Sequence, residues 1–207
     1  KDYIRDTAPT FRKPTFDQLE GFIQPTFAAL VDGAKYVDER LEEILAEVEP
    51  DVVVEDNVVA FPAVPASGRT WVRIVSCNPA ELKDPDVPPA FSGYRADDRT
   101  RWQDFRDEYR RTHGALHADF DAFCRERGAP PLPDLEFIHS SPSLNLYIYP
   151  READYPRGNP LGPGWHNLES SVRSTDAGWE LPDHLAAGDD PLVYLSLGSL
   201  ASGDVEL

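Results

Sequence analysis

The stretch that decides the fold is residues 49–62, which read EPDVVVEDNVVAFP. A long helical pattern ends before Pro50, a run of valines follows, and the run stops at Asp56 and Asn57. Short apolar runs of this kind are typical of strands that are buried on both faces of a parallel sheet. Because ligands bind outside the carboxyl ends of strands in open α/β sheets, Asp56 is expected to face a cleft. The alternative is that Asp56 only caps the helix that follows.

An amphipathic helix is predicted before this strand. Its start resembles a capping box, with Asp17 followed by Glu20. Apolar residues then recur at every third or fourth position as far as Val48. Pro25 is expected to kink this helix or to split it in two. The phenylalanine-rich first half either packs in the core or forms the wall of an apolar pocket.

A second strand is predicted at residues 71–75, WVRIV, after a proline-broken segment that can hold only a short helix. A strand, a short crossover and another strand make a βαβ unit, whose handedness is nearly always right. Residues 79–98 are rich in Pro, Asp and Gly and are predicted to form a long loop, and loops of that length are usually functional or disordered.

A second amphipathic helix is predicted over residues 99–127, with Gly128 as its C-terminal cap. Residues 144–149, LNLYIY, predict a third strand, and residues 191–197, PLVYLSL, predict a fourth after a connector rich in Pro, Gly and Asp. The predicted fold class is therefore α/β, a Rossmann-like parallel sheet with flanking helices.

Composition excludes several classes of function. The chain has 207 residues with 37 Asp and Glu against 20 Lys and Arg, so the basic surface that nucleic acids require is not expected. No apolar run is long enough to cross a bilayer. Cys77 and Cys124 lie far apart without metal-ligand spacing, which favours free thiols in a reducing compartment. These features indicate a soluble cytoplasmic protein and leave the oligomeric state open.

Two short motifs have both a functional and a structural interpretation. Gly198-Ser199 follows a predicted strand and precedes a helix start, which is a geometry that binds phosphate, although such turns are also common without a ligand. His113 and His117 lie four residues apart on a predicted helix and could bind a metal, but no third ligand accompanies them. Solvated helix histidines are the favoured interpretation, and no metal site is predicted.

Five stretches, taken in order, resemble a family 1 UDP-glycosyltransferase of the GT-B type, nearest to the bacterial macrolide glycosyltransferases. They read PDVVVEDN at 50–57, WVRIVSCNP at 71–79, YIYP at 147–150, WH at 165–166 and VYLSLGS at 193–199. The resemblance extends over most of the chain from about residue 49, and it is carried by the ordered set and not by any one motif.

The resemblance implies two facing Rossmann-like domains and a metal-independent, inverting sugar transfer. The donor would be a nucleotide diphosphate sugar, most simply a UDP-sugar, acting as co-substrate without another cofactor, and the acceptor a hydroxyl of a small hydrophobic molecule. In the family a histidine in the first strand–helix loop is the general base, and an aspartate at a later strand end orients it. Asp56 matches that aspartate, and Gly198 with Ser199 matches the loop that contacts the donor diphosphate.

The same resemblance divides the chain and assigns further residues. Residues 1–164 correspond to an acceptor-binding domain without its first strand, 165–190 to an interdomain connector, and 191–207 to the start of the donor-binding domain. Six residues are expected near the acceptor: Phe11, Phe16, Phe22, Phe27, Asn57 and Asn78.

The chain departs from the family pattern in several respects. The rest of the donor-binding domain is expected beyond Leu207, and Pro62 and Pro65 interrupt the helix that commonly follows the aspartate. All five of its histidines follow Asp56, so the base histidine is expected upstream of Lys1, and the chain alone is expected to be inactive. Two alternatives stay open. One is a non-catalytic α/β ligand-binding domain, and the other is a different GT-B enzyme such as a nucleotide-sugar epimerase.

Overall fold

The computed structural model describes residues 2–169, 180–186, 191 and 193. The chain forms two compact units, of which one comprises residues 13–171 and the other combines residues 1–12 with 172–207. The helices α1 (Asp2–Phe11) and α6 (Asp183–Ala186) belong to the second unit. The first unit contains the sheet and the long helices.

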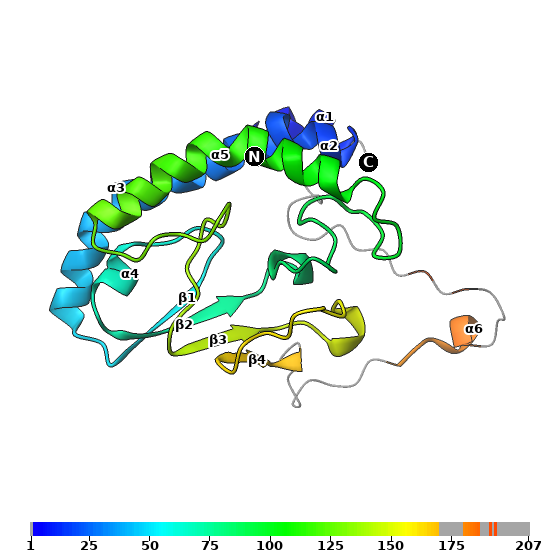
Figure 1. Cartoon of the computed structure of the whole chain (residues 1–207). Coiled ribbons are helices and arrows are strands. Elements are labelled where there is room, and N and C mark those ends of the chain that lie inside the picture. The colour runs from blue at the N-terminus through cyan, green and yellow to red at the C-terminus, as the bar shows by residue number, and fades with distance from the viewer. Residues whose placement is uncertain (1, 170–179, 187–190, 192, 194–207) are drawn as a thin grey trace. The chain divides into compact units, whose positions relative to one another are not determined.

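A four-stranded parallel sheet forms the centre of the first unit (Figure 1). Its strands are β1 (Val52–Asp56), β2 (Thr70–Val75), β3 (Leu144–Tyr147) and β4 (Trp165–Asn167), and they lie side by side in that order. The predicted parallel α/β sheet is thus confirmed for the first three strands. The sequence did not predict β4, because three residues are too few to show a periodicity.

The predicted strand at residues 191–197 and the Gly198-Ser199 turn lie outside the described residues, apart from Pro191 and Val193. The sheet itself includes Trp165–Asn167, just beyond the expected domain boundary at residue 164. Within the described chain, none of the helices combines the length and the apolar character that a membrane span requires.

The strand order explains why the helices gather on one side of the sheet. Each strand lies beside its predecessor in the same direction, and right-handed crossovers between such strands all fall on the same face. The two long helices, α3 (Gln24–Val48) and α5 (Trp102–Glu126), indeed run side by side over one face (Figure 1). On the opposite face the described chain leaves Val54 61% exposed.

The helix expected before β1 is interrupted as Pro25 predicted. A short helix, α2 (Thr15–Gln18), passes through a π-helical turn at Leu19–Ile23 into α3, whose first turn contains Pro25. The predicted capping box is wrong: α2 begins after Pro14 without a side-chain cap, and Asp17 lies inside its first turn. Because proline has no backbone N–H, it cannot donate to the turn before it, and the helix passes through the π-helical turn at this point before α3 continues to Val48.

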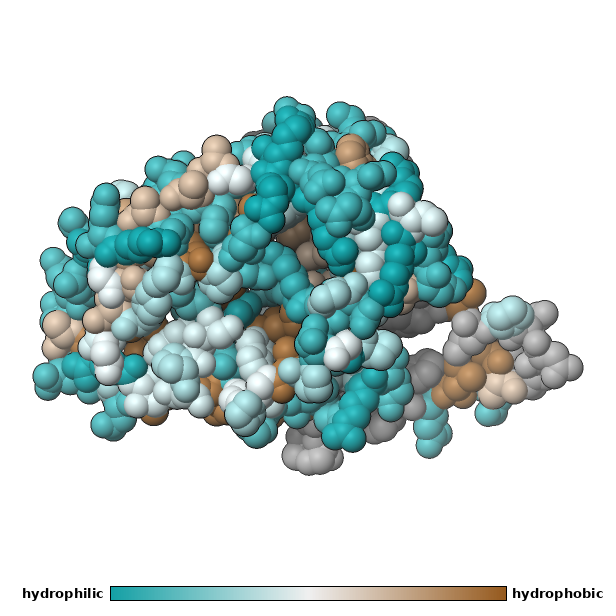
Figure 2. Space-filling view, viewed as in Figure 1, coloured by the Kyte–Doolittle hydropathy of each residue, from teal (hydrophilic) through white to brown (hydrophobic). Residues whose placement is uncertain are grey.

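The main core lies between α3, α5 and the segments that follow β1 and α5. Its members share nearly complete burial and an apolar side chain: Phe27, Val31, Ala34, Val59, Ala60, Phe120, Cys124 and Phe137. Gly128 has a φ of 84° directly after α5, which confirms the predicted glycine cap, since a left-handed backbone there suits glycine. On the face of the molecule shown in Figure 2, hydrophilic residues predominate and apolar residues appear as small scattered patches.

Candidate functional site

The carboxyl ends of the four strands meet at one edge of the sheet, where ligands bind in parallel α/β proteins. Asp56 closes β1 there with an exposed side chain. The hydroxyl of Ser76, which directly follows β2, donates a hydrogen bond of 2.7 Å to Asp56 Oδ1. Asp56 is therefore an exposed carboxylate at the predicted edge of the sheet, and one of its oxygens accepts a hydrogen bond from the residue that follows β2.

Asp56 does not cap the helix that follows it. That helix, α4 (Ala63–Ala66), begins after Pro62, and the backbone N–H of Ala63 donates to Asp38 Oδ1 in α3 at 2.9 Å. The capping alternative for Asp56 is accordingly wrong.

Strand alternation separates Glu55 from Asp56. Successive side chains in a strand point to opposite faces, so one carboxyl group reaches each side of the sheet. Glu55 lies on the helix-covered face, where it is only 8% exposed. Burial raises the pKa of Glu55 to about 7, against the opposing influence of the Arg73 charge.

A polar row crosses the covered face beside Glu55. Glu55 aligns with Arg73 of β2, which aligns with Asn145 of β3 and, through it, with Trp165 of β4. The Arg73 guanidinium pairs with Glu81 Oε1 at 3.1 Å and lies 5.7 Å from the centre of the Trp165 ring. Inner faces of parallel sheets are normally apolar, so charged residues in this row require an explanation.

Two polar atoms in this row have no hydrogen-bond partner although they are buried. They are Glu55 Oε2, an acceptor, and Arg73 Nε, a donor. Asn145 differs, since its side-chain amide both accepts from Ser141 N and donates to Ser141 O at 2.8 Å. Buried polar atoms are nearly always satisfied, and four further exceptions occur among the described residues, at Trp102, His113, Tyr149 and Arg157, so unpartnered buried atoms are not confined to this row.

A pocket of about 500 Å³ opens at the carboxyl ends of β3 and β4. Two tyrosines, an arginine and an amide provide aromatic and polar contacts in a volume that suits a small organic molecule. The lining residues are Tyr147, Arg151, Asp154, Tyr155, Pro156 and Asn167. Arg157 braces this wall, because its guanidinium pairs with Asp154 at 2.9 Å and also donates to the carbonyl of Pro79.

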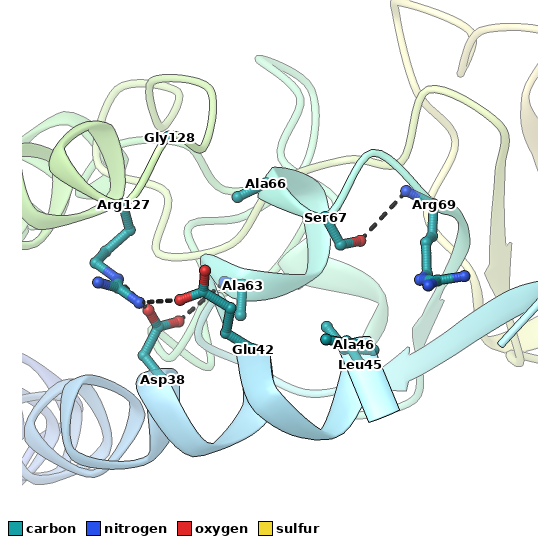
Figure 3. Close-up of a pocket in the computed structure, with 10 residues that line it drawn as sticks. All are labelled: Asp38, Glu42, Leu45, Ala46, Ala63, Ala66, Ser67, Arg69, Arg127 and Gly128. Atoms are coloured by element: carbon teal, nitrogen blue, oxygen red, sulfur yellow. Dashed lines mark hydrogen bonds and ion pairs between the residues drawn. The ribbon is translucent and has the colours of Figure 1, made fainter. Parts of the chain in front are cut away.

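A second pocket, of about 290 Å³, lies between α3, α4 and the end of α5 (Figure 3). At its centre Asp38, 1% exposed, accepts Arg127 Nε at 2.6 Å in addition to the N–H of Ala63, and Arg127 also pairs with Glu42. Arg69, on its rim, precedes β2. This pocket is therefore at the amino ends of the strands. Its ion pairs connect the helices to one another and do not lie at the edge where ligands bind.

The predicted acceptor phenylalanines of the first unit lie in different surroundings. Phe27 is in the main core, with its ring centre 4.9 Å from that of Phe137. Phe16 packs edge-on against Phe105 of α5 at 6.2 Å, and Phe22 is half-buried. Phe11 is 52% exposed in α1, which belongs to the other unit.

Asn57 and Asn78 lie at the carboxyl edge, directly after β1 and three residues after β2. Each uses its side-chain oxygen locally: Asn57 Oδ1 accepts the N–H of Val58 at 3.0 Å, and Asn78 Oδ1 accepts that of Ala80 at 2.9 Å. The second bond caps the 3-10 turn Pro79–Glu81, which carries Glu81 to Arg73. Asn78 therefore has a structural role that the sequence did not indicate.

The two histidines of the pair lie in different surroundings. His113 is fully buried, with its Nδ1 2.7 Å from the hydroxyl of Thr112 and its ring stacked 4.0 Å from that of Tyr109. Burial lowers its pKa to about 4, so the expectation of a solvated histidine is wrong there. His117 Nε2 lies 2.9 Å from the Pro133 carbonyl. Across the described residues no three His, Cys, Asp or Glu side chains gather as a metal site would need.

Comparison with known proteins does not show a family for this chain. No family model matches this sequence, and no curated protein is significantly similar to it.

Sequence reasoning missed Glu55, Arg73 and Glu81 as a group. The available signal was a charged residue inside an otherwise apolar strand, as in Arg73 within WVRIV. A charge in such a position must be paired or bound once the strand is buried.

Proposed function

We propose that this chain is part of an inverting glycosyltransferase, which moves a sugar from a nucleotide diphosphate sugar to a hydroxyl of a small hydrophobic acceptor. The observation that carries the proposal is Asp56, an exposed carboxylate at the carboxyl end of β1 with one oxygen held by Ser76. A carboxylate so held can orient a histidine base and stabilise the imidazolium that forms during proton transfer.

The strand order supports the proposal. In a doubly wound sheet of order 3-2-1-4-5-6, strands 4 to 6 follow one another in one direction. The order β1-β2-β3-β4 has that form. The sheets of GT-B domains are of the doubly wound kind, so the order fits the resemblance carried by residues 50–57 and 71–79.

The chemistry assigned to Asp56 is indirect. The acceptor hydroxyl loses its proton to the base while its oxygen attacks the anomeric carbon of the donor. The bond from that carbon to the diphosphate breaks on the opposite side, and the diphosphate leaves with the electron pair. Asp56 is therefore a positioning residue.

The test uses the protein expressed from its complete coding region, with UDP-glucose and a panel of phenolic acceptors. Asp56→Ala is expected to lower kcat by roughly 10²–10⁴ while the melting temperature stays unchanged, as for loss of a general-base partner. Asp51→Ala is the matched control, since Asp51 is an exposed aspartate at the other end of the same strand.

Two results would contradict the proposal. One is a wild-type protein that transfers no sugar from any nucleotide donor, which would favour a non-catalytic ligand-binding domain. The other is an Asp56→Ala protein with unchanged kcat.

A further inference from the structure

The pocket at the amino ends of the strands has walls that the fold holds in place (Figure 3). Asp38 of α3 is buried and joins three elements, because it accepts the N–H of Ala63 in α4 and Nε of Arg127 at the end of α5. A fully hydrogen-bonded cluster of this kind rigidifies the elements around it. The pocket of about 290 Å³ is therefore preformed, as small-molecule sites usually are.

Part of the pocket lining is an apolar wall made mostly of small side chains. It consists of Leu45 and Ala46 from α3 and Ala63 and Ala66 from α4. Leu45 and Ala63 are buried, whereas Ala46 is exposed at the surface. The short alanine side chains leave room between the two helices. A chain of methylene groups that lies against this wall leaves water, which favours its binding in proportion to the apolar area covered.

An excess of negative charge lies at one end of the apolar wall. Two carboxylates, those of Asp38 and Glu42, share the single guanidinium of Arg127. Glu42 Oε2 accepts Arg127 Nη2 at 2.5 Å, and the Glu42 side chain is 67% exposed, so a ligand can reach it from solvent. An ammonium group, which carries a positive charge and donates hydrogen bonds, is the ligand chemistry that suits this end.

Arg69 supplies a positive charge near the other end of the wall. Its Nη1 donates to the carbonyl of Pro50 at 3.1 Å, just beyond the last turn of α3. A bond through Nη1 leaves the side formed by Nε and Nη2, which matches the two oxygens of a carboxylate. Glu42 precedes Pro50 by about two helical turns, and Ala46 lies midway between them (Figure 3).

We propose that this pocket binds a linear zwitterion, with its ammonium group at Glu42, its carboxylate at Arg69 and an apolar chain along the alanine-rich wall. A separation of about two helical turns selects an ω-amino carboxylic acid with several methylene groups. An α-amino acid has both charged groups on one carbon atom and cannot reach both ends. This binding is independent of sugar transfer, because Asp56 lies at the opposite ends of the strands.

Three probes with one chain length test the pocket by NMR titration of the protein expressed from its complete coding region. 6-Aminohexanoate carries both charges, hexanoate lacks the ammonium group, and 1-aminohexane lacks the carboxylate. Salt at about 0.15 M screens the net charge of −17 on the chain. 6-Aminohexanoate is expected to bind about fivefold more tightly than either other probe, as for one partly exposed charge pair, and to shift the amide signals of Ala46 and Ala66.

Two variants separate the roles of the two charges. Glu42→Gln should remove the preference for 6-aminohexanoate over hexanoate, and Arg69→Gln should remove the preference over 1-aminohexane. Glu43→Gln changes a 63% exposed glutamate of α3 that does not line the pocket, so it is the matched control and should bind as wild type. If Arg69→Gln does not melt cooperatively, Arg69→Lys replaces it, since lysine keeps the charge without the paired donors and should also weaken that preference.

A third variant shows whether the ligand lies inside the pocket. Ala46→Leu enlarges an exposed residue of the apolar wall, so it should fill part of the pocket and weaken the binding of 6-aminohexanoate. The proposal is overturned if wild type binds the three probes equally or binds none of them. Unchanged binding of 6-aminohexanoate by Ala46→Leu, or a full preference in the folded charge variants, overturns it as well. None of these outcomes depends on whether the protein transfers sugar.

Discussion

Two buried charge clusters at opposite ends of the same strands are built differently. At the amino end, Asp38 has both oxygens engaged, by the N–H of Ala63 and by Arg127. On the carboxyl side, Glu55 and Arg73 each keep one buried atom without a partner. A fully paired cluster rigidifies a fold, whereas a partly paired one destabilises it unless something binds. The comparison therefore sets a fully paired cluster of buried charge against a partly paired one.

The largest effect is expected at the amino end. Asp38→Ala should lower the free energy of unfolding by about 3–5 kcal/mol, because it leaves Arg127 and the first N–H of α4 without their shared partner. Urea denaturation measures the change. Asp119→Ala, which removes the exposed partner of Lys35, is the control and should cost less than about 1 kcal/mol. A loss of similar size in both variants would contradict a special role for Asp38.

A smaller effect, with a distinctive pH dependence, is expected at the carboxyl side. Glu55 has a pKa of about 7 in the folded protein and an ordinary value of 4.5 when unfolded, so the folded state binds the proton more tightly. Its contribution to stability is complete below pH 4.5 and is lost as the pH rises through 7. The loss should amount to about 3–4 kcal/mol.

The measurement is the free energy of unfolding between pH 4 and 8 for wild type and Glu55→Gln. The variant should lack this decline and should be the more stable protein at pH 8. Parallel curves for the two proteins would show that Glu55 is paired or solvated in solution.

The smallest loss of stability is expected from a change at Asn145, which lies in the same polar row as Glu55 and Arg73. Asn145→Ala removes the two hydrogen bonds to the backbone of Ser141 and should cost about 2 kcal/mol, with no change in its pH dependence. Asn145 is thus a fully hydrogen-bonded residue beside two residues that have unpartnered atoms. Urea denaturation of Asn145→Ala at pH 5 and 8 measures this loss of stability. A loss that differs between the two pH values would mean that Asn145 and Glu55 act together.

Much of the fold follows from local patterns. The apolar runs of β1 and of WVRIV indicate strands, and the three-and-four spacing of apolar residues indicates the two amphipathic helices. The parallel sheet follows from the alternation of these strands and helices. Pro25 and Gly128 acted as expected, since their backbone preferences depend on no distant residue. β4 was missed because its three residues are held by pairing with β3 and not by their own pattern.

The candidate site was less predictable for a physical reason. Alternation shows that Glu55 and Asp56 take opposite faces, but which face the helices cover depends on the direction of every crossover along the chain. His113 was expected in water because no third ligand accompanied the histidine pair, yet its ring lies edge-on to that of Phe27. Burial is a property of the assembled layers, and the pKa values of Glu55 and His113 follow from it.

The acidic pair at the end of β1 has a consequence for how this strand can vary. Because side chains alternate, deleting one valine from the run would shift the pairing with β2 by one residue and exchange the surfaces that Glu55 and Asp56 reach. Composition, charge and hydropathy would hardly change. The carboxyl group of Glu55, whose pKa is raised by burial, would then be exposed to water, and that of Asp56 would be buried beneath the helices. The length of the valine run is thus as much a part of the site as the two acids themselves.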